Sequence, residues 1–395
     1  MTTATVSRWA RRFVFTGALF LLVWALAALI GTPRRVEVVL VLFGFVLHTV
    51  FGKGYSLIPV YFDRELAVAR APFVQFPLSV GGTALLALDG LRASPAWVGT
   101  VGALCWSLGV LVFAGSLLWT VRGDLSGAAT GTGAVNTHRQ ALDRVANAFV
   151  PVALVYLLLG SYGVLAAETG LPVVFDGSLA RSSHLLAAGT GALFVFAVGF
   201  RLLPRFFVAT PPRFAPVLVF PAAAGGPLLI ATYLPSGQWF RLGAVLEASA
   251  VVAFAIVLGV LSYRSERRRV GFYGVLAGAV CGCLGVGLGL QFALGGLQPG
   301  LGLAHARLNL VGFLGLTIVG VSYQFYPPAV GTFPGAGDRT ALGAIACLLV
   351  GLVLGVTGLA FDVPVFELLG GVSALAGAVA HVWLLGGLFR ERANR

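Results

Sequence analysis

Residues 305–327 read HARLNLVGFLGLTIVGVSYQFYP, and Arg307 is the only formally charged side chain in this stretch. A helix needs about 20 predominantly apolar residues to cross the hydrocarbon core of a bilayer. The stretch is long enough for one crossing, and it ends at a proline, which cannot continue a helix. It therefore predicts a membrane-spanning helix with a histidine, His305, at one mouth.

Comparable apolar runs follow one another along the whole chain and are joined by short links. Counting them predicts twelve spanning helices, at about 13–31, 36–60, 73–91, 96–121, 147–167, 183–207, 214–234, 241–263, 270–292, 305–327, 341–361 and 366–390. The one long polar link, 122–146, is rich in Gly, Ala and Thr and is expected to be a flexible cytoplasmic loop. The predicted fold is all-α, with residues 1–395 forming a single integral membrane domain.

The composition excludes several other classes of protein. Of the 395 residues, 58% are hydrophobic and only 10% are charged, which is too little polar surface to cover a soluble globule of this size. Disordered chains are poor in large apolar residues, and here the +12 net charge lies on the links between apolar runs rather than on one face. We therefore expect a lipid bilayer, and no nucleic acid, as a partner.

Arginine is distributed unequally between the two sets of links. With the N-terminus inside, 19 arginines fall on the inner segments and six on the outer ones. The positive-inside rule then places both termini in the cytoplasm and the protein in the cell membrane.

Three segments resemble one another and lie four predicted helices apart. They are GFVLHTVFGKGYSLIP (44–59), GALFVFAVGFRLLP (191–204) and GFLGLTIVGVSYQFYP (312–327), each with two glycines eight residues apart followed by a proline. Small residues two turns apart permit close contact between helices. The pattern predicts three four-helix units around a pseudo-threefold axis. The alternative is that small residues and prolines are simply common in membrane helices.

Histidines are the strongest candidates for chemistry in this chain. Of the five, His48, His184, His305 and His381 are predicted within or at the mouth of spanning helices, whereas His138 lies in the polar link. Ionisable groups within a bilayer are costly and usually face the interior of the bundle, so each of the four is a candidate site. We expect His138 to be solvated.

The strings around His184 (SHLLAAGTGALFVFAVGFRLLP, 183–204) and His305 resemble helices 6 and 10 of the haem-copper oxidase subunit I superfamily, which includes the nitric oxide reductase large subunit. In that family each helix begins with a metal-ligating histidine and ends at a proline. The expected twelve helices, cytoplasmic termini and threefold pattern fit the same fold. The resemblance therefore covers nearly the whole chain.

The chain departs from that family at most of the metal ligands. Arg307 stands where the family's helix 10 holds a low-spin haem, and the second ligand position falls near Glu37 or Val38. The helix predicted at 214–234 contains no histidine, so copper binding is poorly supported. The resemblance implies one b-type haem held by His305, with His184 as distal ligand or gas-pocket residue. In this respect the chain is similar in spirit to the NnrS-type haem-and-copper membrane proteins linked to nitric oxide stress.

Other ionisable residues within the predicted spans leave alternatives open. His48 and His381 are expected at similar depth, either sharing a second site or each satisfied within the core. Glu247 and Lys53 are compatible with a proton path, an ion pair or partial hydration. Arg307 is expected to pair with haem propionates, or only to set orientation, together with Arg181 and Arg241.

The function predicted from these observations is haem binding linked to a diatomic gas (NO or O2), to a nitric oxide response or to respiratory electron transfer. An oxidoreductase activity stays open, because most of the catalytic ligands are missing, and the electron donor is not indicated. Two other readings remain. One is a twelve-helix transporter without a cofactor, and the other is a structural subunit that retained the fold and lost its metals.

Overall fold

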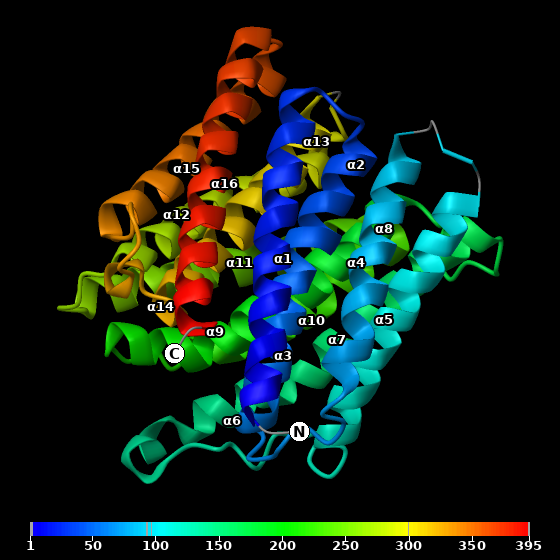
Figure 1. Ribbon diagram of the computed structural model, residues 1–395. Coiled ribbons are helices and arrows are strands. Elements are labelled where there is room, and N and C mark those ends of the chain that lie inside the picture. Colours follow the sequence, from blue (N-terminus) through cyan, green and yellow to red (C-terminus); the bar gives the residue numbers. More distant parts are fainter. Residues whose placement is uncertain (1–2, 92–93, 96, 299, 394–395) are drawn as a thin grey trace.

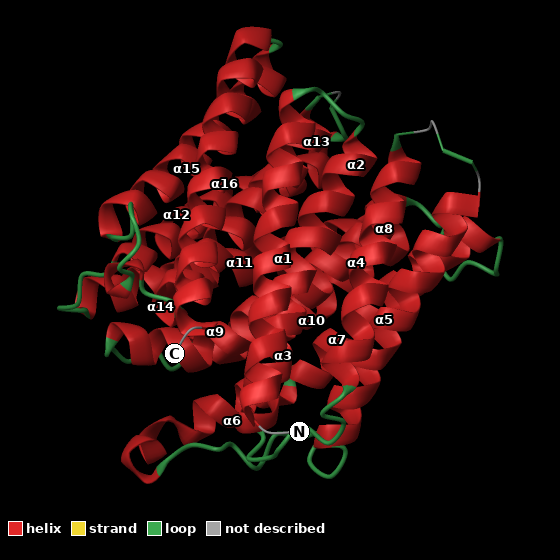
Figure 2. Cartoon of the chain, viewed as in Figure 1, coloured by secondary structure: helices red, strands yellow, loops and turns green. Residues whose placement is uncertain are grey.

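The computed structural model describes residues 3–91, 94–95, 97–298 and 300–393. Within these residues it contains helices and no strand (Figure 2). The first half comprises α1 (Thr3–Leu29), α2 (Arg34–Val38), η1 (Val39–Leu47), α3 (His48–Tyr61), α4 (Ala71–Gly90), α5 (Trp97–Val121), η2 (Ala134–Arg139), α6 (Gln140–Ala148), α7 (Val150–Thr169), α8 (Leu179–His184), η3 (Leu185–Ala192) and α9 (Leu193–Phe207). The second half comprises α10 (Ala215–Tyr233), α11 (Gln238–Arg264), α12 (Val270–Gly295), α13 (Leu301–Arg307), η4 (Leu308–Leu316), α14 (Thr317–Phe325), η5 (Pro328–Val330), α15 (Asp338–Phe361) and α16 (Pro364–Ala393).

These elements form twelve helices long and apolar enough to cross a membrane within the described residues, as in an integral membrane protein. This confirms the number and approximate position of the predicted spans. Three of the spans are built from several elements in succession: α2, η1 and α3 (Arg34–Tyr61), α8, η3 and α9 (Leu179–Phe207), and α13, η4 and α14, which η5 follows after a break at Tyr326 and Pro327 (Leu301–Val330). We call these three the central helices, because of their burial.

The central helices lie inside the bundle and the other spans surround them (Figure 1). In their most apolar stretches 94%, 72% and 83% of the residues are buried, against 39–56% in the other spans described. The segments η1, η3 and η4 of the central helices also contact one another. Two of the three are apolar along nearly their whole length, because a helix surrounded by protein has no solvent-facing side.

Each central helix contains a π-helical stretch at a corresponding position. The stretches η1, η3 and η4 end 12, 12 and 11 residues before the prolines Pro59, Pro204 and Pro327. A π-helix pairs each N–H with the carbonyl five residues back, is rare, and is frequent at functional sites. These are the three segments whose sequences resemble one another.

Glycines on the central helices make close contact with peripheral helices. A Cβ at Gly52 of α3 would stand 2.6 Å from the Ala10 carbonyl oxygen of α1. Gly320 of α14 lies equally close to the backbone of Gly271 in α12. These glycines let backbones approach each other, as their spacing predicts.

The start of α1 and the end of α16 lie toward the end of the bundle that carries α6, which we call the terminal end (Figure 1). Part of the link expected at 122–146 folds there into η2 and α6. Arg201 of α9 donates to the Thr130 carbonyl at 2.7 Å and to Asn147 Oδ1 at 2.7 Å, and Arg205 pairs with the buried Asp143 carboxylate at 2.6 Å. Two arginines counted for orientation, Arg92 and Arg395, lie outside the described residues.

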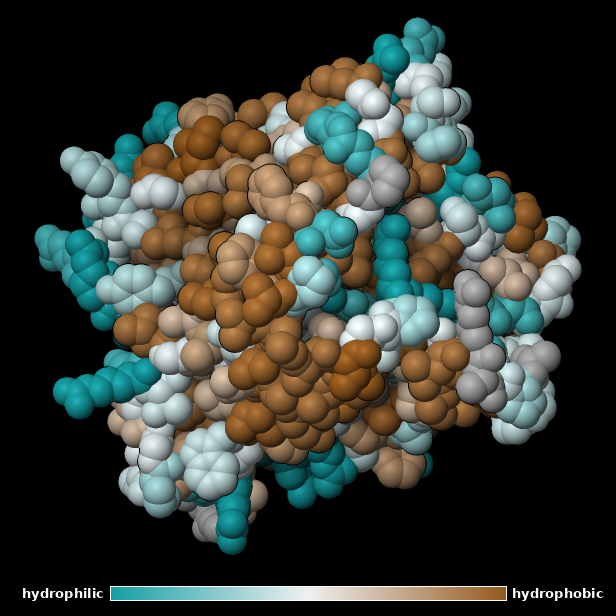
Figure 3. Space-filling model, turned by 90° about the horizontal axis from the view of Figure 1, so that it is seen from above, coloured by the Kyte–Doolittle hydropathy of each residue, from teal (hydrophilic) through white to brown (hydrophobic). Residues whose placement is uncertain are grey.

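The surface is largely apolar, as a lipid-facing surface must be. Viewed from the end opposite to the termini, hydrophobic residues occupy much of the surface and hydrophilic residues form separate groups among them (Figure 3). Large apolar side chains on the flanks are exposed, among them Leu111, Val280, Leu284 and Trp383. In water such exposure would favour association, whereas in a bilayer it is the expected contact with acyl chains.

Candidate functional site

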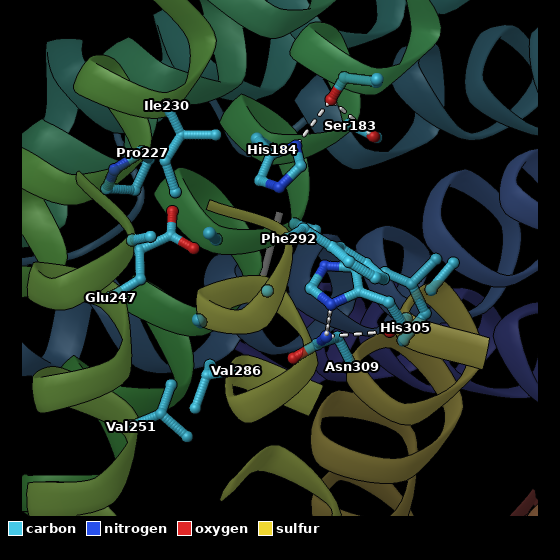
Figure 4. Close-up of a pocket in the computed structure, with 18 of the residues that line it drawn as sticks. Ser183, His184, Pro227, Ile230, Glu247, Val251, Val286, Phe292, His305 and Asn309 are labelled. Atoms are coloured by element: carbon cyan, nitrogen blue, oxygen red, sulfur yellow. Dashed lines mark hydrogen bonds between the residues drawn. The ribbon is translucent and has the colours of Figure 1, made fainter. Parts of the chain in front are cut away.

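A cavity lies near the end of the bundle opposite to the termini, and both His184 and His305 line it (Figure 4). Its volume is about 220 Å³, and its walls come from α2, α8, η3, α9, α10, α11, α12, α13 and η4. Small side chains make the space, because eight alanines contribute to the walls: Ala180, Ala187, Ala188, Ala192, Ala223, Ala244, Ala250 and Ala306. We call it the histidine cavity.

The two histidines come from the last turns of two short α-helical segments, each directly before a π-helical stretch. His184 Nδ1 lies 2.7 Å from the Ala180 carbonyl oxygen, and His305 Nδ1 lies 2.9 Å from the Gly285 carbonyl oxygen. A carbonyl oxygen can only accept, so in both rings Nδ1 carries the hydrogen. The lone pair of each neutral imidazole is therefore on Nε2.

The two imidazoles face the same gap (Figure 4). Their ring centres are 6.2 Å apart and their planes differ by 26°. Among the described residues, neither Nε2 has a hydrogen-bond partner in the protein, and both rings are partly accessible because they border the cavity. Metal-ligating histidines typically donate the other ring N–H to a carbonyl or carboxylate, which is the arrangement seen in both rings.

Neighbouring residues on α12 and η4 position the His305 ring. Gly289 faces it so closely that a Cβ would stand 3.0 Å from its Cε1 atom. Asn309, one turn along the central helix, donates to the His305 carbonyl at 2.8 Å. Asn309 also approaches Nδ1 at 3.4 Å, and its side chain packs against Gly285. The orientation of His305 is thus fixed from two helices.

Two charged side chains also line the histidine cavity. Glu247 of α11 points into it from the wall opposite the imidazoles (Figure 4), and its Oε1 atom is buried without a hydrogen-bond partner in the described residues. Arg34, at the start of α2, is exposed and borders the cavity beside Gly302. The sequence indicated Glu247 only as an intramembrane charge, and nothing in the sequence singled out Arg34.

Arg307 does not line the histidine cavity but forms a buried ion pair. Its Nε and Nη2 atoms donate to the two oxygens of Glu37 at 2.9 and 2.8 Å, and Trp24 Nε1 donates to the same carboxylate at 3.2 Å. The Glu37 side chain is 3% exposed. The ion pair therefore joins two central helices, and the Glu37 carboxylate also binds α1 through Trp24. The structure thus gives Arg307 a partner within the protein, and Arg34 is the basic side chain at the cavity.

The other two arginines of that group bind backbone carbonyls. Arg181 donates to the carbonyls of Ala231 and Thr232 at 2.7 and 2.8 Å and also to that of Leu234. Arg241 donates to the Ala293 carbonyl at 3.3 Å. Both side chains thus tie neighbouring helix ends together close to the cavity.

The structure places His48 and His381 in separate surroundings. His48 is fully buried against the rings of Phe13, Phe20 and Phe51, and its Nε2 atom has no partner in the described residues. His381 Nδ1 lies 3.0 Å from the Tyr323 hydroxyl. The described residues show no hydrogen bond or ring contact between the two histidines, so geometry gives no support to a shared site.

Lys53 lies in the second turn of α3, and its side chain reaches the end of α14. Its Nζ atom donates to the Tyr326 hydroxyl at 3.0 Å and stands 3.6 Å from the centre of the Phe325 ring. The described residues provide no carboxylate partner for it. An aromatic cradle of this kind stabilises a cation by cation–π attraction.

The donor set of the histidine cavity consists of two imidazoles. Among the described residues, no three His, Cys, Asp or Glu side chains come together as a metal-binding group. A complete protein-derived cage is thus not formed, and the two imidazoles are suited to axial positions on a metal whose remaining ligands come from elsewhere. In comparisons with known proteins, no family model and no curated sequence matches this chain.

Proposed function

We propose that this membrane protein binds one b-type haem in the histidine cavity, through His305 with His184 as the second axial ligand, and presents it to a diatomic gas. The observation that carries the proposal is the pair of facing imidazoles whose Nδ1 atoms both bind backbone carbonyls. Haem in such a pocket supplies an iron centre that binds gases or passes single electrons.

The spacing of the rings fits axial ligation from both sides. Metal–imidazole bonds are about 2 Å long, and with about 1 Å from nitrogen to ring centre on each side, the ring centres fall about 6 Å apart. The observed separation is 6.2 Å. His305 is held from two helices, whereas His184 is held by its own helix alone. On this ground His305 would be the residue that holds the haem firmly, and His184 would be the less constrained of the two imidazoles.

The mainly apolar wall of the histidine cavity suits a haem, but its volume is small for one. Its volume of about 220 Å³ exceeds the ~150 Å³ that admits benzene in an engineered apolar cavity, but lies below the ~300 Å³ at which ligand pockets commonly begin. A macrocycle therefore requires the α10–α11 wall to move outward. The alanines of that wall, Ala223, Ala244 and Ala250, present little side chain to displace.

The two charged groups complete the proposed site. Arg34 is exposed at the cavity, where its guanidinium is suited to carboxylates such as propionates. Glu247 faces the imidazoles from an apolar wall, where it can hold a proton on Oε1 or release it toward a bound gas. We include both in the site.

We further propose a distant relationship to haem-copper oxidase subunit I, with three four-helix units and both termini in the cytoplasm. The support is three buried central helices four spans apart, each with a π-helical stretch at a corresponding position. On this proposal, the two helices that clamp the family's low-spin haem instead hold the Arg307–Glu37 ion pair. A second haem is then absent, and independent oxidase turnover is not expected.

The test is a pyridine haemochrome assay and a reduced-minus-oxidised spectrum on detergent-purified protein, with metal analysis. We expect near-stoichiometric haem b in the wild type and its loss in His305→Ala. His138→Ala, which removes an imidazole from the polar link, is the matched control and should keep the haem. His184→Ala should retain haem but lose the six-coordinate spectrum. Colourless, iron-free wild-type protein would refute the proposal.

A single metal ion is the second candidate, and the cavity volume is the observation that favours it. Two facing imidazoles 6.2 Å apart suit a copper or zinc ion as well as haem iron, and an ion needs no widening of the walls. Copper or zinc bound without haem, and lost in both His184→Ala and His305→Ala, would select this candidate. If the protein bound no metal, the two remaining candidate functions would be a transporter and a structural subunit.

A further inference from the structure

A second cavity of about 90 Å³ lies on the axis of the bundle, between the three central helices. Residues of η1 and α3, of η3 and α9, and of α14 all border it. No sequence pattern pointed to it, because it arises where three helices from distant parts of the chain meet. We call it the axial cavity.

The wall of the axial cavity is almost entirely apolar. Valines and leucines of the three helices form most of it: Val46, Val50, Leu57, Val195, Val198, Leu202, Leu203 and Val321. Four polar side chains border it. Among the described residues the Ser322 hydroxyl has no hydrogen-bond partner, whereas Thr317 Oγ1 lies against Gly278 of α12. Thr49 donates to the Phe45 carbonyl at 2.9 Å, and the Lys53 ammonium donates to the Tyr326 hydroxyl at 3.0 Å.

These surroundings decide what the cavity can hold. A buried water needs two to four polar partners, and an apolar cavity that lacks them stays dry and takes up apolar molecules such as xenon. With Thr49 and Lys53 bonded to other groups and Thr317 turned against α12, Ser322 is the remaining hydroxyl at the axial cavity, and one hydroxyl cannot hold a water chain that carries protons toward Lys53. A small apolar gas has no such requirement.

The axial cavity lies directly beyond the histidine cavity along the same helices. On the third central helix, Leu310 and Leu314 border the histidine cavity, and Ile318 and Val321 border the axial cavity. Gly191 borders the axial cavity, and a Cβ there would stand 3.1 Å from Cδ1 of Leu314. The Leu314 side chain is thus the partition between the two spaces.

We propose that the axial cavity is a docking site for an apolar diatomic gas such as NO or O2, and that rotation of the Leu314 side chain admits the gas to the histidine cavity. The docking site stands on the axial cavity alone, whereas the delivery step rests on the proposed haem function. Gases of this kind partition into the bilayer interior, so a dry cavity within the bundle can store them near the site.

Xenon, which is apolar and has no hydrogen-bonding capacity, tests the docking site without haem. We expect one xenon atom in the axial cavity of the pressurised wild-type crystal, or one saturable ¹²⁹Xe exchange signal in detergent. Val198→Phe and, independently, Val321→Phe fill the cavity from two helices and should abolish this site. Val280→Phe adds the same ring on the exposed side of α12 and should leave it intact.

The variants also separate loss of the cavity from loss of the fold. A phenylalanine variant counts only if its gel-filtration profile and unfolding midpoint match those of Val280→Phe, and Val321→Ala, which enlarges the cavity, must retain xenon. Ordered water in the cavity, or xenon binding that persists in both filled variants, would overturn the docking site.

Gas recombination after photolysis tests delivery in the haem-loaded protein. Leu314→Ala removes the partition and should accelerate CO recombination with the reduced haem, while Val198→Phe should slow it several-fold. Unchanged rates in both variants would refute delivery through the axial cavity. A colourless protein would defeat the proposed haem function and with it the delivery step, while the xenon experiment would still decide the docking site.

Discussion

Replacing Arg307 by methionine is expected to destabilise the bundle by about 3–5 kcal/mol, because it leaves the Glu37 carboxylate buried without its cation. That carboxylate is 3% exposed and accepts two hydrogen bonds from Arg307, at 2.9 and 2.8 Å. Only the bond from Trp24, at 3.2 Å, survives the substitution. Methionine is similar in length to the arginine stem, so little packing is lost and the cost is electrostatic.

The measurement is SDS-induced unfolding in mixed micelles, followed by tryptophan fluorescence and circular dichroism. In Arg307→Met/Glu37→Gln both partners are neutral, and most of the lost stability should return, to within about 1–2 kcal/mol of the wild type. Arg241→Met removes an arginine that makes one long bond to a backbone carbonyl, so a change of about 0.5 kcal/mol is expected.

The outcome that refutes the reasoning is a single variant, Arg307→Met, that unfolds like Arg241→Met. A second refutation is a double variant no more stable than the single one, because the cost would then not arise from an unpaired carboxylate. If Arg307→Met lost haem at unchanged stability, the result would instead support the original expectation that Arg307 pairs with haem propionates.

Three further predictions concern the terminal end. Lys53→Met should cost about 1–2 kcal/mol in the same unfolding assay, because it removes the cation from its aromatic cradle and from the Tyr326 hydroxyl. Asp143→Ala should cost about 3–5 kcal/mol by leaving the Arg205 guanidinium unpaired, and limited proteolysis should then cleave the 122–146 link faster. Burial raises the pKa of the Asp124 carboxyl, but hydrogen bonds from the backbone N–H groups of Ala129 and Ala128 and from Ser126, with the nearby Arg64 charge, together outweigh it and lower that pKa below its ordinary value. The turn after Asp124 is therefore stabilised above the ordinary pKa and loses this stabilisation as the pH falls through the lowered one, which hydrogen exchange of its amides will show.

Span number and position were predictable because the bilayer imposes one length and one polarity on every crossing. All twelve predicted runs correspond to spanning helices of the described structure, with ends shifted by a few residues in most cases. The largest difference is at the fifth span, which begins at Ala134 and not near 147, because η2 and α6 continue directly into α7. Apolarity alone does not reveal a short polar helix at a helix end.

Which histidines lie next to each other was less predictable than where the spanning helices begin and end. His184 and His305 were expected at similar depth, and depth was enough to bring them together across the cavity. His48 and His381 were also expected at similar depth, yet they lie against different rings. Depth fixes one coordinate of a side chain, and its direction around the helix axis fixes whether two residues meet.

Arg307 and Glu37 show the same limit from the opposite side. Both positions were noted individually as departures from a family pattern, and neither residue identifies the other as its partner in the sequence. A buried guanidinium and a buried carboxylate in an apolar bundle each require a counter-charge, so their meeting is physically reasonable once both central helices are placed side by side. The arrangement of the helices, and not the residue types, identifies Glu37 as the partner of Arg307.

The π-helical stretches explain why the direction of a side chain around its helix axis was not predictable from the sequence. In each central helix the chain turns with one additional residue between hydrogen-bonded groups, so side chains beyond the stretch are rotated from where a regular 3.6-residue repeat places them. His305 and Asn309 face the histidine cavity, while Ile318 and Val321 beyond η4 face the axial cavity. No residue type marks such a stretch strongly, because the π-helix differs from the α-helix only in which carbonyl each N–H chooses. The third central helix borders both the histidine cavity and the apolar axial cavity, and the proposed gas storage relies on that adjacency.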